Sequence, residues 1–91
     1  MAHKSAEDLH NMLNEARTRV EVGGMYYHYK HPDKLYTLVD VIIIEATDEV
    51  GVLYRAEYDD LKGVTFMRPI EDFLSEVEFN GEIVKRFTLV S

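Results

Sequence analysis

The chain has 91 residues, the length of one domain, and carries 10 lysines and arginines against 17 aspartates and glutamates, a net charge of −7. This charge excludes the overall basic surface of a non-specific DNA-binding protein. The absence of cysteine excludes disulfides, thiolate zinc sites, iron–sulfur clusters and a cysteine nucleophile. Because no apolar run has membrane-spanning length and no secretory signal is visible, we expect a soluble, cytoplasmic protein without membrane contact.

The stretch from Ser5 to about Val20 predicts an amphipathic helix, with Ser5 as its N-cap and Gly23-Gly24 after its end. On this basis we divide the chain into an N-terminal helical extension, residues 1–22, and a small β domain, residues 23–91. The apolar residues that recur at helical spacing are Leu9, Met12, Leu13, Ala16 and Val20.

Short segments rich in β-branched and aromatic residues follow the two glycines and alternate with turn residues. The sequence Asn80-Gly81 is the strongest hairpin signal, because both residues tolerate a positive φ. The predicted strands are residues 25–29, 35–46, 50–58, 64–68, 76–79 and 82–87. The predicted turns are residues 31–34, 47–49 and 59–63, with a helical turn at residues 70–74.

Five or six short antiparallel strands with tight turns, in so few residues, close most easily into a small barrel. We therefore predict a mainly β fold, a small SH3-like barrel of five or six antiparallel strands with an N-terminal α-helix. The alternative is an open five-stranded sheet with the helix packed on one face. The apolar stripe of the helix is expected to cover its own barrel or sheet rather than a partner helix.

One set of residues in the β domain occurs together in a known family. These residues, in chain order, are Tyr27, His28, Tyr29, Lys30, Tyr36, Val39, Val52, Tyr54, Arg55, Tyr58, Met67, Arg68, Pro69, Phe73, Glu76, Val77, Gly81, Arg86 and Phe87. On them, residues 24–87 resemble a bacterial domain-of-unknown-function family, numbered sixteen fifty-three. The resemblance implies a compact, mostly β domain and implies no activity. One departure is that Val64-Thr65-Phe66-Met67 stands where the family commonly has a tryptophan before the arginine–proline pair.

Aromatic side chains alternate with cations in three of the predicted strands, and a small barrel would bring these strands together. Such a surface stacks planar rings, and its guanidinium groups bind carboxylate or phosphate with two parallel hydrogen bonds. In this hypothesis two arginines hold the anion, two tyrosines form the wall, and a histidine and a lysine complete the rim. The predicted ligand-binding residues are, in that order, Arg55, Arg68, Tyr54, Tyr58, His28 and Lys30.

The same residues also have a purely structural interpretation. The tyrosines of strand 50–58 fall on its buried face, with their hydroxyl groups at the rim of the core. The arginines then form ordinary ion pairs with Glu57, Asp59 or Glu71. Both interpretations remain open at the level of the sequence.

The sequence predicts no catalytic residue, no metal site and no cofactor. No serine lies in a nucleophile motif, and no glycine-rich phosphate loop is present. The spacing of His28, His31 and Asp33 is not that of a metal motif. Asp40 stands in the middle of a predicted strand, where we expect it to face outward or to pair with Arg55.

We therefore predict a non-enzymatic binding module that recognises a small anionic or aromatic ligand, or a peptide carrying such groups. The alternative is a small nucleic-acid-associated domain that uses the same face. Charge disfavours this alternative, because residues 23–91 contain seven lysines and arginines against thirteen aspartates and glutamates. A protein–protein interaction domain is the third hypothesis.

Overall fold

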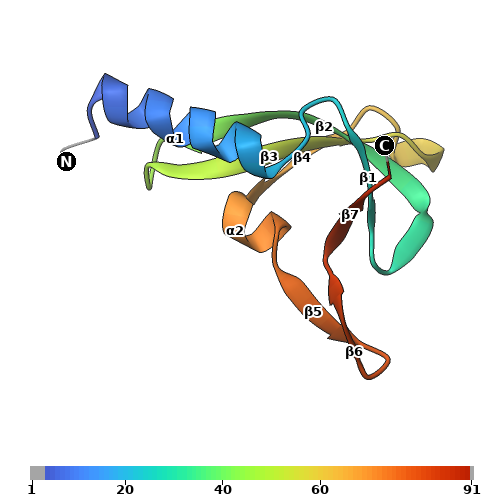
Figure 1. Cartoon of the computed structure of the whole chain (residues 1–91). Coiled ribbons are helices and arrows are strands. Elements are labelled where there is room, and N and C mark those ends of the chain that lie inside the picture. Colours follow the sequence, from blue (N-terminus) through green and yellow to red (C-terminus); the bar gives the residue numbers. More distant parts are fainter. Residues whose placement is uncertain (1–3, 91) are drawn as a thin grey trace.

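The computed structural model of the chain describes residues 4–90, and it is mainly β with one long N-terminal helix (Figure 1). Within these residues no helix has both the length and the apolar character needed to cross a lipid bilayer. The helical elements are α1 (Ala6–Arg19), the 3-10 helix η1 (Asp59–Leu61) and α2 (Ile70–Phe73). The strands are β1 (Met25–His28), β2 (His31–Ile44), β3 (Glu49–Ala56), β4 (Thr65–Pro69), β5 (Glu76–Phe79), β6 (Glu82–Lys85) and β7 (Phe87–Leu89).

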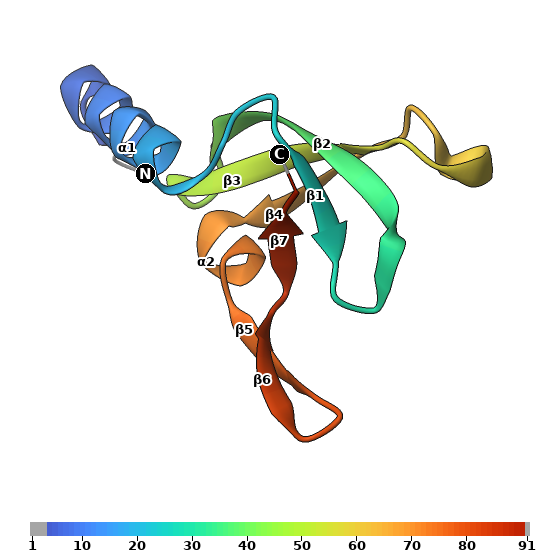
Figure 2. The same ribbon diagram turned by 45° about the vertical axis from the view of Figure 1, so that its right-hand side comes forward.

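Five strands form one antiparallel sheet in the order β4-β3-β2-β1-β7, and β5 pairs only with β6. The two edge strands, β4 and β7, do not pair with each other in the part of the chain that the structure describes. The closed barrel predicted from the sequence is therefore wrong, and the sheet is open. The physical reason is that α2 and the projecting β5–β6 hairpin occupy the chain between β4 and β7 (Figure 2).

Helix α1 begins as predicted, because the Ser5 hydroxyl accepts a hydrogen bond from the Asp8 backbone N–H (N···Oγ 3.1 Å). Ala16 and Val20 are buried in the core that the sheet also lines, and Met12 packs against that core. The helix thus covers its own sheet, as the sequence predicted. It lies against β2 and β3 (Figure 1).

The first hairpin differs from the sequence prediction, which placed a turn at residues 31–34. The turn is instead at residues 29–30, and β2 already begins at His31. His28 pairs with His31 but Tyr27 pairs with Leu35, so residues 32–34 form a bulge. Pro32 is tolerated in this strand because a bulge does not require its missing backbone N–H.

The β5–β6 hairpin forms on the predicted turn, with φ of 55° at Asn80 and 80° at Gly81. The strand predicted over residues 82–87 is divided, however. β6 ends at Lys85, and β7 begins at Phe87 on the main sheet. At Arg86, between them, the backbone N–H donates to the Ser75 carbonyl (2.9 Å), so the chain changes partner there.

The core is centred on Phe73 of α2, which is 1% exposed. Its ring stacks on Phe87 (centroids 4.3 Å apart, planes at 10°) and meets the Tyr26 ring edge-on. Leu38 and Val52 are fully buried beside it. The buried side chains of β3 alternate as predicted, at Val50, Val52, Tyr54 and Ala56, and Gly51 between the first two is buried as well.

We predict that Phe73→Ala lowers the free energy of unfolding by about 3 to 5 kcal/mol, because it removes a buried aromatic ring and leaves a cavity. A domain of this size has little more stability than that. Chemical denaturation should therefore show a variant that is largely unfolded without denaturant. The matched control is Phe79→Ala, whose side chain is 39% exposed and whose loss should cost much less. An equal loss in both variants would contradict the central place of Phe73.

Candidate functional site

The inner face of the sheet, which lines the core, brings several of the predicted site residues together. Tyr54 on β3 lies opposite Phe66 on β4, and Val52 lies opposite Arg68. Directly opposed residues in an antiparallel pair share a face, so the Tyr54 and Arg68 side chains lie on the same side. The Arg68 Nε–H donates a hydrogen bond to the Tyr54 hydroxyl (2.9 Å).

Tyr36 on β2 joins the aromatic rings of this face into a continuous row. Its ring centroid lies 5.3 Å from that of Tyr54 and 5.3 Å from that of Tyr58, with edge-to-face geometry in both cases. The hydroxyl oxygens of Tyr36 and Tyr58 are 2.6 Å apart, a hydrogen bond. Burial, followed by this hydrogen bond, raises the pKa of Tyr36, which is therefore uncharged at neutral pH.

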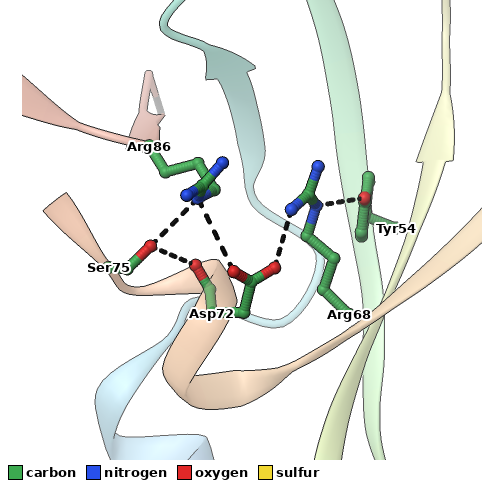
Figure 3. A network of polar contacts seen from close by, with 5 residues as sticks. All are labelled: Tyr54, Arg68, Asp72, Ser75 and Arg86. Carbon is green, nitrogen blue, oxygen red and sulfur yellow. Dashed lines mark hydrogen bonds and ion pairs between the residues drawn. The ribbon is translucent and has the colours of Figure 1, made fainter. Parts of the chain in front are cut away.

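Two guanidinium groups share one carboxylate at the end of this row (Figure 3). Arg68 Nη1 donates to Asp72 Oδ2 at 2.6 Å, and Arg86 Nε lies 3.8 Å from Asp72 Oδ1. Arg86 Nε also donates to the Ser75 hydroxyl (2.9 Å), which in turn donates to the Asp72 carbonyl (2.6 Å). One negative charge thus faces two positive charges, and the group of three carries a net charge of +1.

His28 lies next to these two arginines. Its ring meets Phe87 edge-on at 5.1 Å, and Arg68 Cζ lies 5.6 Å from the centre of the same Phe87 ring. Burial lowers the pKa of His28 to about 4, with further lowering by the positive charges of Arg68, Arg86 and Lys30. The backbone N–H of Lys30 donates to His28 Nδ1 (3.3 Å), which places the proton of the neutral ring on Nε2.

The structure thus brings together four of the six predicted residues, and a fifth lies at their edge. His28, Tyr54, Tyr58 and Arg68 lie on the inner face. Lys30 is exposed in the β1–β2 turn, with its Nζ 5.9 Å from the centre of the Tyr29 ring.

Arg55 does not join them. It lies opposite Thr37 and Thr65, on the outer face of the sheet. Its guanidinium pairs with Glu57 (Nη2···Oε2 2.9 Å), and hydrogen bonds from Thr37 and Arg55 lower the pKa of Glu57. The expected convergence of Arg55 and Arg68 is wrong, because side chains of successive strand residues point to opposite faces and Arg55 follows the inward Tyr54.

The sequence prediction missed three residues of this face, Tyr36, Asp72 and Arg86. Tyr36 and Arg86 were visible only as members of the family motif, since neither stands in an alternating pattern of aromatic and cationic residues. Asp72 lies in the first turn of α2, where a carboxylate is ordinary. Only the folding of α2 beneath the sheet shows that this carboxylate lies between two arginines.

The remaining polar candidates have structural partners. Asp40 Oδ1 accepts a hydrogen bond from the Val41 backbone N–H (2.8 Å) and lies 3.6 Å from Arg17 Nη2 of α1. The side chain faces outward, as expected, but its cationic partner is Arg17 rather than Arg55. Across residues 4–90, no three histidine, aspartate or glutamate side chains gather in a way that would hold a metal ion.

We predict that the free energy of unfolding falls as the pH decreases from about 6.5 to about 5, and that His28→Gln reduces this fall. The pKa of His28 is about 4 in the folded chain, against 6.5 for an ordinary histidine. The unfolded chain therefore binds more protons in this range, and acid favours unfolding. Urea titrations at several pH values check this, with the exposed His10→Gln as control. Equal pH slopes in the parent and in His28→Gln would contradict the burial of this ring beside the arginines.

Comparisons with known proteins find a similar fold and a family of unknown function, and they indicate no activity. A search of the curated proteins gives no significant match. A solved structure, the crystal structure of a protein belonging to DUF1653 from Bordetella bronchiseptica, superimposes with a TM-score of 0.66 at 26% identity, and the match covers 75% of this chain and 85% of that one. The family model described as "Protein of unknown function (DUF1653)" matches residues 24–89, so the chain belongs to the DUF1653 family.

Proposed function

We propose that the chain is a non-enzymatic binding module for a small anionic ligand that also carries a planar group, or for a peptide with such a group. The proposed site, which we call the Tyr–Arg face, consists of His28, Tyr36, Tyr54, Tyr58, Arg68 and Arg86. The single observation that carries the proposal is the sharing of the Asp72 carboxylate by Arg68 and Arg86.

The two guanidinium groups have hydrogen-bonding capacity left over. Within residues 4–90, Nη2 of Arg68 and both terminal nitrogens of Arg86 have no hydrogen-bond partner. The side chains of Arg68 and Arg86 are 32% and 24% exposed, so these donors are partly shielded from water. A carboxylate or phosphate is the group that satisfies such donors best, through charge-assisted and bidentate hydrogen bonds.

The local charge supports the same ligand class. The chain as a whole has a net charge of −7, yet the positive charges around His28 contribute to its lowered pKa. An anion bound beside Arg68 and Arg86 would compensate this field. Neutral His28 also offers its Nε2–H as one further donor.

The tyrosines supply the planar contact. Tyr36 and Tyr58 are partly exposed and stand edge-to-face in one row. Exposed aromatic rings bind flat groups by stacking, with little dependence on the identity of the ring that stacks. The proposed ligand therefore joins an anion and a ring, as an aromatic carboxylate or a nucleotide does.

Binding of single-stranded nucleic acid by this face is the alternative, and the salt dependence of affinity separates the two. Each phosphate that is neutralised steepens the fall of affinity with salt. A single anion that binds at Arg68 and Arg86 gives a shallow dependence. A strand that follows several cations gives a steep one.

We expect Arg86→Gln to weaken binding about tenfold or more, because it removes charge-assisted hydrogen bonds to the anion. Calorimetric titrations with benzoate, adenosine monophosphate and a uridine hexanucleotide measure this at several salt concentrations. The matched control is Arg55→Gln on the outer face, which should bind like the parent. Thermal unfolding shows whether each variant is folded.

Three results would contradict the proposal. The first is an equal affinity of the parent and folded Arg86→Gln for every probe. The second is a similar loss in Arg55→Gln. The third is that the parent binds none of the probes at millimolar concentration.

A further inference from the structure

Strand β7 is an edge strand, and half of its backbone groups point away from the sheet. Within residues 4–90 it pairs with β1 alone, with Tyr27 opposite Thr88. The Val90 N–H donates to the Met25 carbonyl (2.7 Å), and the Tyr29 N–H donates to the Arg86 carbonyl (3.0 Å). The Arg86 carbonyl, the Thr88 backbone groups and the Val90 N–H therefore face β1.

Because hydrogen bonding alternates along an antiparallel strand, the intervening residues point the other way. The backbone N–H and C=O groups of Phe87 and Leu89 are consequently directed away from β1. Leu89 is 45% exposed, whereas Phe87 is 6% exposed. Such a row of four backbone groups is the pattern that an additional strand completes.

A cavity of about 370 Å³ lies along this edge. Its polar rim consists of Thr18, Glu21, Lys85 and Arg19. Lys85 has no ion pair in the described part of the chain, whereas the Arg19 guanidinium already binds the Glu71 carboxylate (2.8 and 3.1 Å). The volume is at the small end of those that hold ligands, which suits one large apolar side chain. The apolar lining comes from Val20, Tyr26, Leu74, Phe87 and Leu89.

The position of β7 decides what kind of partner fits. Figures 1 and 2 both show β7 between β1 and α2. The end of α1 with the two residues after it (residues 18–21) and Leu74, directly after α2, line the cavity. The free edge thus faces a cavity whose other side is formed at the ends of these helices. A second copy of this chain, pairing through its own β7, would bring its whole sheet against these helices. A single extended segment would not.

We propose that the edge of β7 accepts an extended peptide segment as a sixth strand of the main sheet. One apolar side chain of the peptide enters the cavity beside Phe87 and Leu74, and an acidic side chain of the peptide pairs with Lys85. The backbone groups of Phe87 and Leu89 provide affinity, and the cavity and Lys85 provide specificity. This surface is separate from the unpaired guanidinium donors of the Tyr–Arg face.

The probe is an acetylated and amidated hexapeptide of alternating leucine and glutamate, titrated into the ¹⁵N-labelled full chain. Bound peptide should slow hydrogen exchange at the Phe87 and Leu89 amides, which face the edge. The Thr88 amide, which faces β1, serves as the internal reference and should change little. The peptide concentration is raised to the millimolar range.

Two variants test the two halves of the surface. Leu89→Pro removes one N–H from the free edge without removing a hydrogen bond to β1, and it should weaken peptide binding at least tenfold while thermal unfolding stays near that of the parent. Lys85→Glu should weaken binding about three- to tenfold and shift the preference to a leucine–lysine hexapeptide. Arg55→Gln, on the outer face of the sheet, should bind the leucine–glutamate peptide like the parent.

Three outcomes would overturn the proposal. One is unchanged exchange at Phe87 and Leu89 at millimolar peptide. Another is peptide-dependent change confined to Tyr36 and Arg68 and lost in Arg86→Gln, which would assign the peptide to the Tyr–Arg face. The third is protection of the edge that depends on protein concentration without peptide, which would assign it to a second copy. Failure here leaves the benzoate and nucleotide titrations of the Tyr–Arg face as a separate test.

Discussion

The stacking of Phe73 on Phe87 is the contact on which the rest of the structure depends. Phe73 belongs to the short helix α2, and Phe87 begins the last strand of the sheet. Their rings, 4.3 Å apart and nearly parallel, attach the far edge of the sheet to the helix that follows the opposite edge. Without this contact, β7 would keep its pairing with β1 and the edge-on contacts of Phe87 with Tyr36 and Tyr54, but it would lose its stacking on α2.

The same ring also organises the polar residues. The Phe87 ring contacts His28 edge-on and lies under the Arg68 guanidinium, so this hydrophobic residue packs against both an imidazole and a guanidinium. Asp72, one residue before Phe73, is held in place by the same helix and contacts both arginines. The core and the charged cluster are therefore not independent. The helix that buries Phe73 also places one carboxylate between two cations, whose remaining donors have no hydrogen-bond partner within residues 4–90.

The features that the sequence predicted are those set by neighbouring residues. Ser5 caps α1, alternation buries Val52 and Tyr54, and Asn80-Gly81 forms the turn of the β5–β6 hairpin, since each depends on local backbone geometry. Closure of the sheet and convergence of the arginines depend on which distant segments meet. Successive residues of a strand point to opposite faces of the sheet, so Arg55 points away from the face that Tyr54 lines. This alternation alone separates Arg55 from the site. Arg86 lies at the site instead of Arg55, because the chain leaves β6 and joins the main sheet at this residue. No local sequence signal marks this change of strand.

The openness of the sheet gives both proposed surfaces their access. In a closed barrel β7 would pair on both sides, so the backbone groups of Phe87 and Leu89 would be occupied and the cavity beside them filled by the closing strand. The interposed α2 prevents this closure and supplies Asp72 to the arginines at the same time. The short helix α2 thus accounts for two features next to Phe87. One is the unpaired edge of β7, and the other is the net positive charge of Arg68, Arg86 and Asp72. Both surfaces therefore border one buried residue, because Phe87 lines the cavity and also packs against His28 and Arg68.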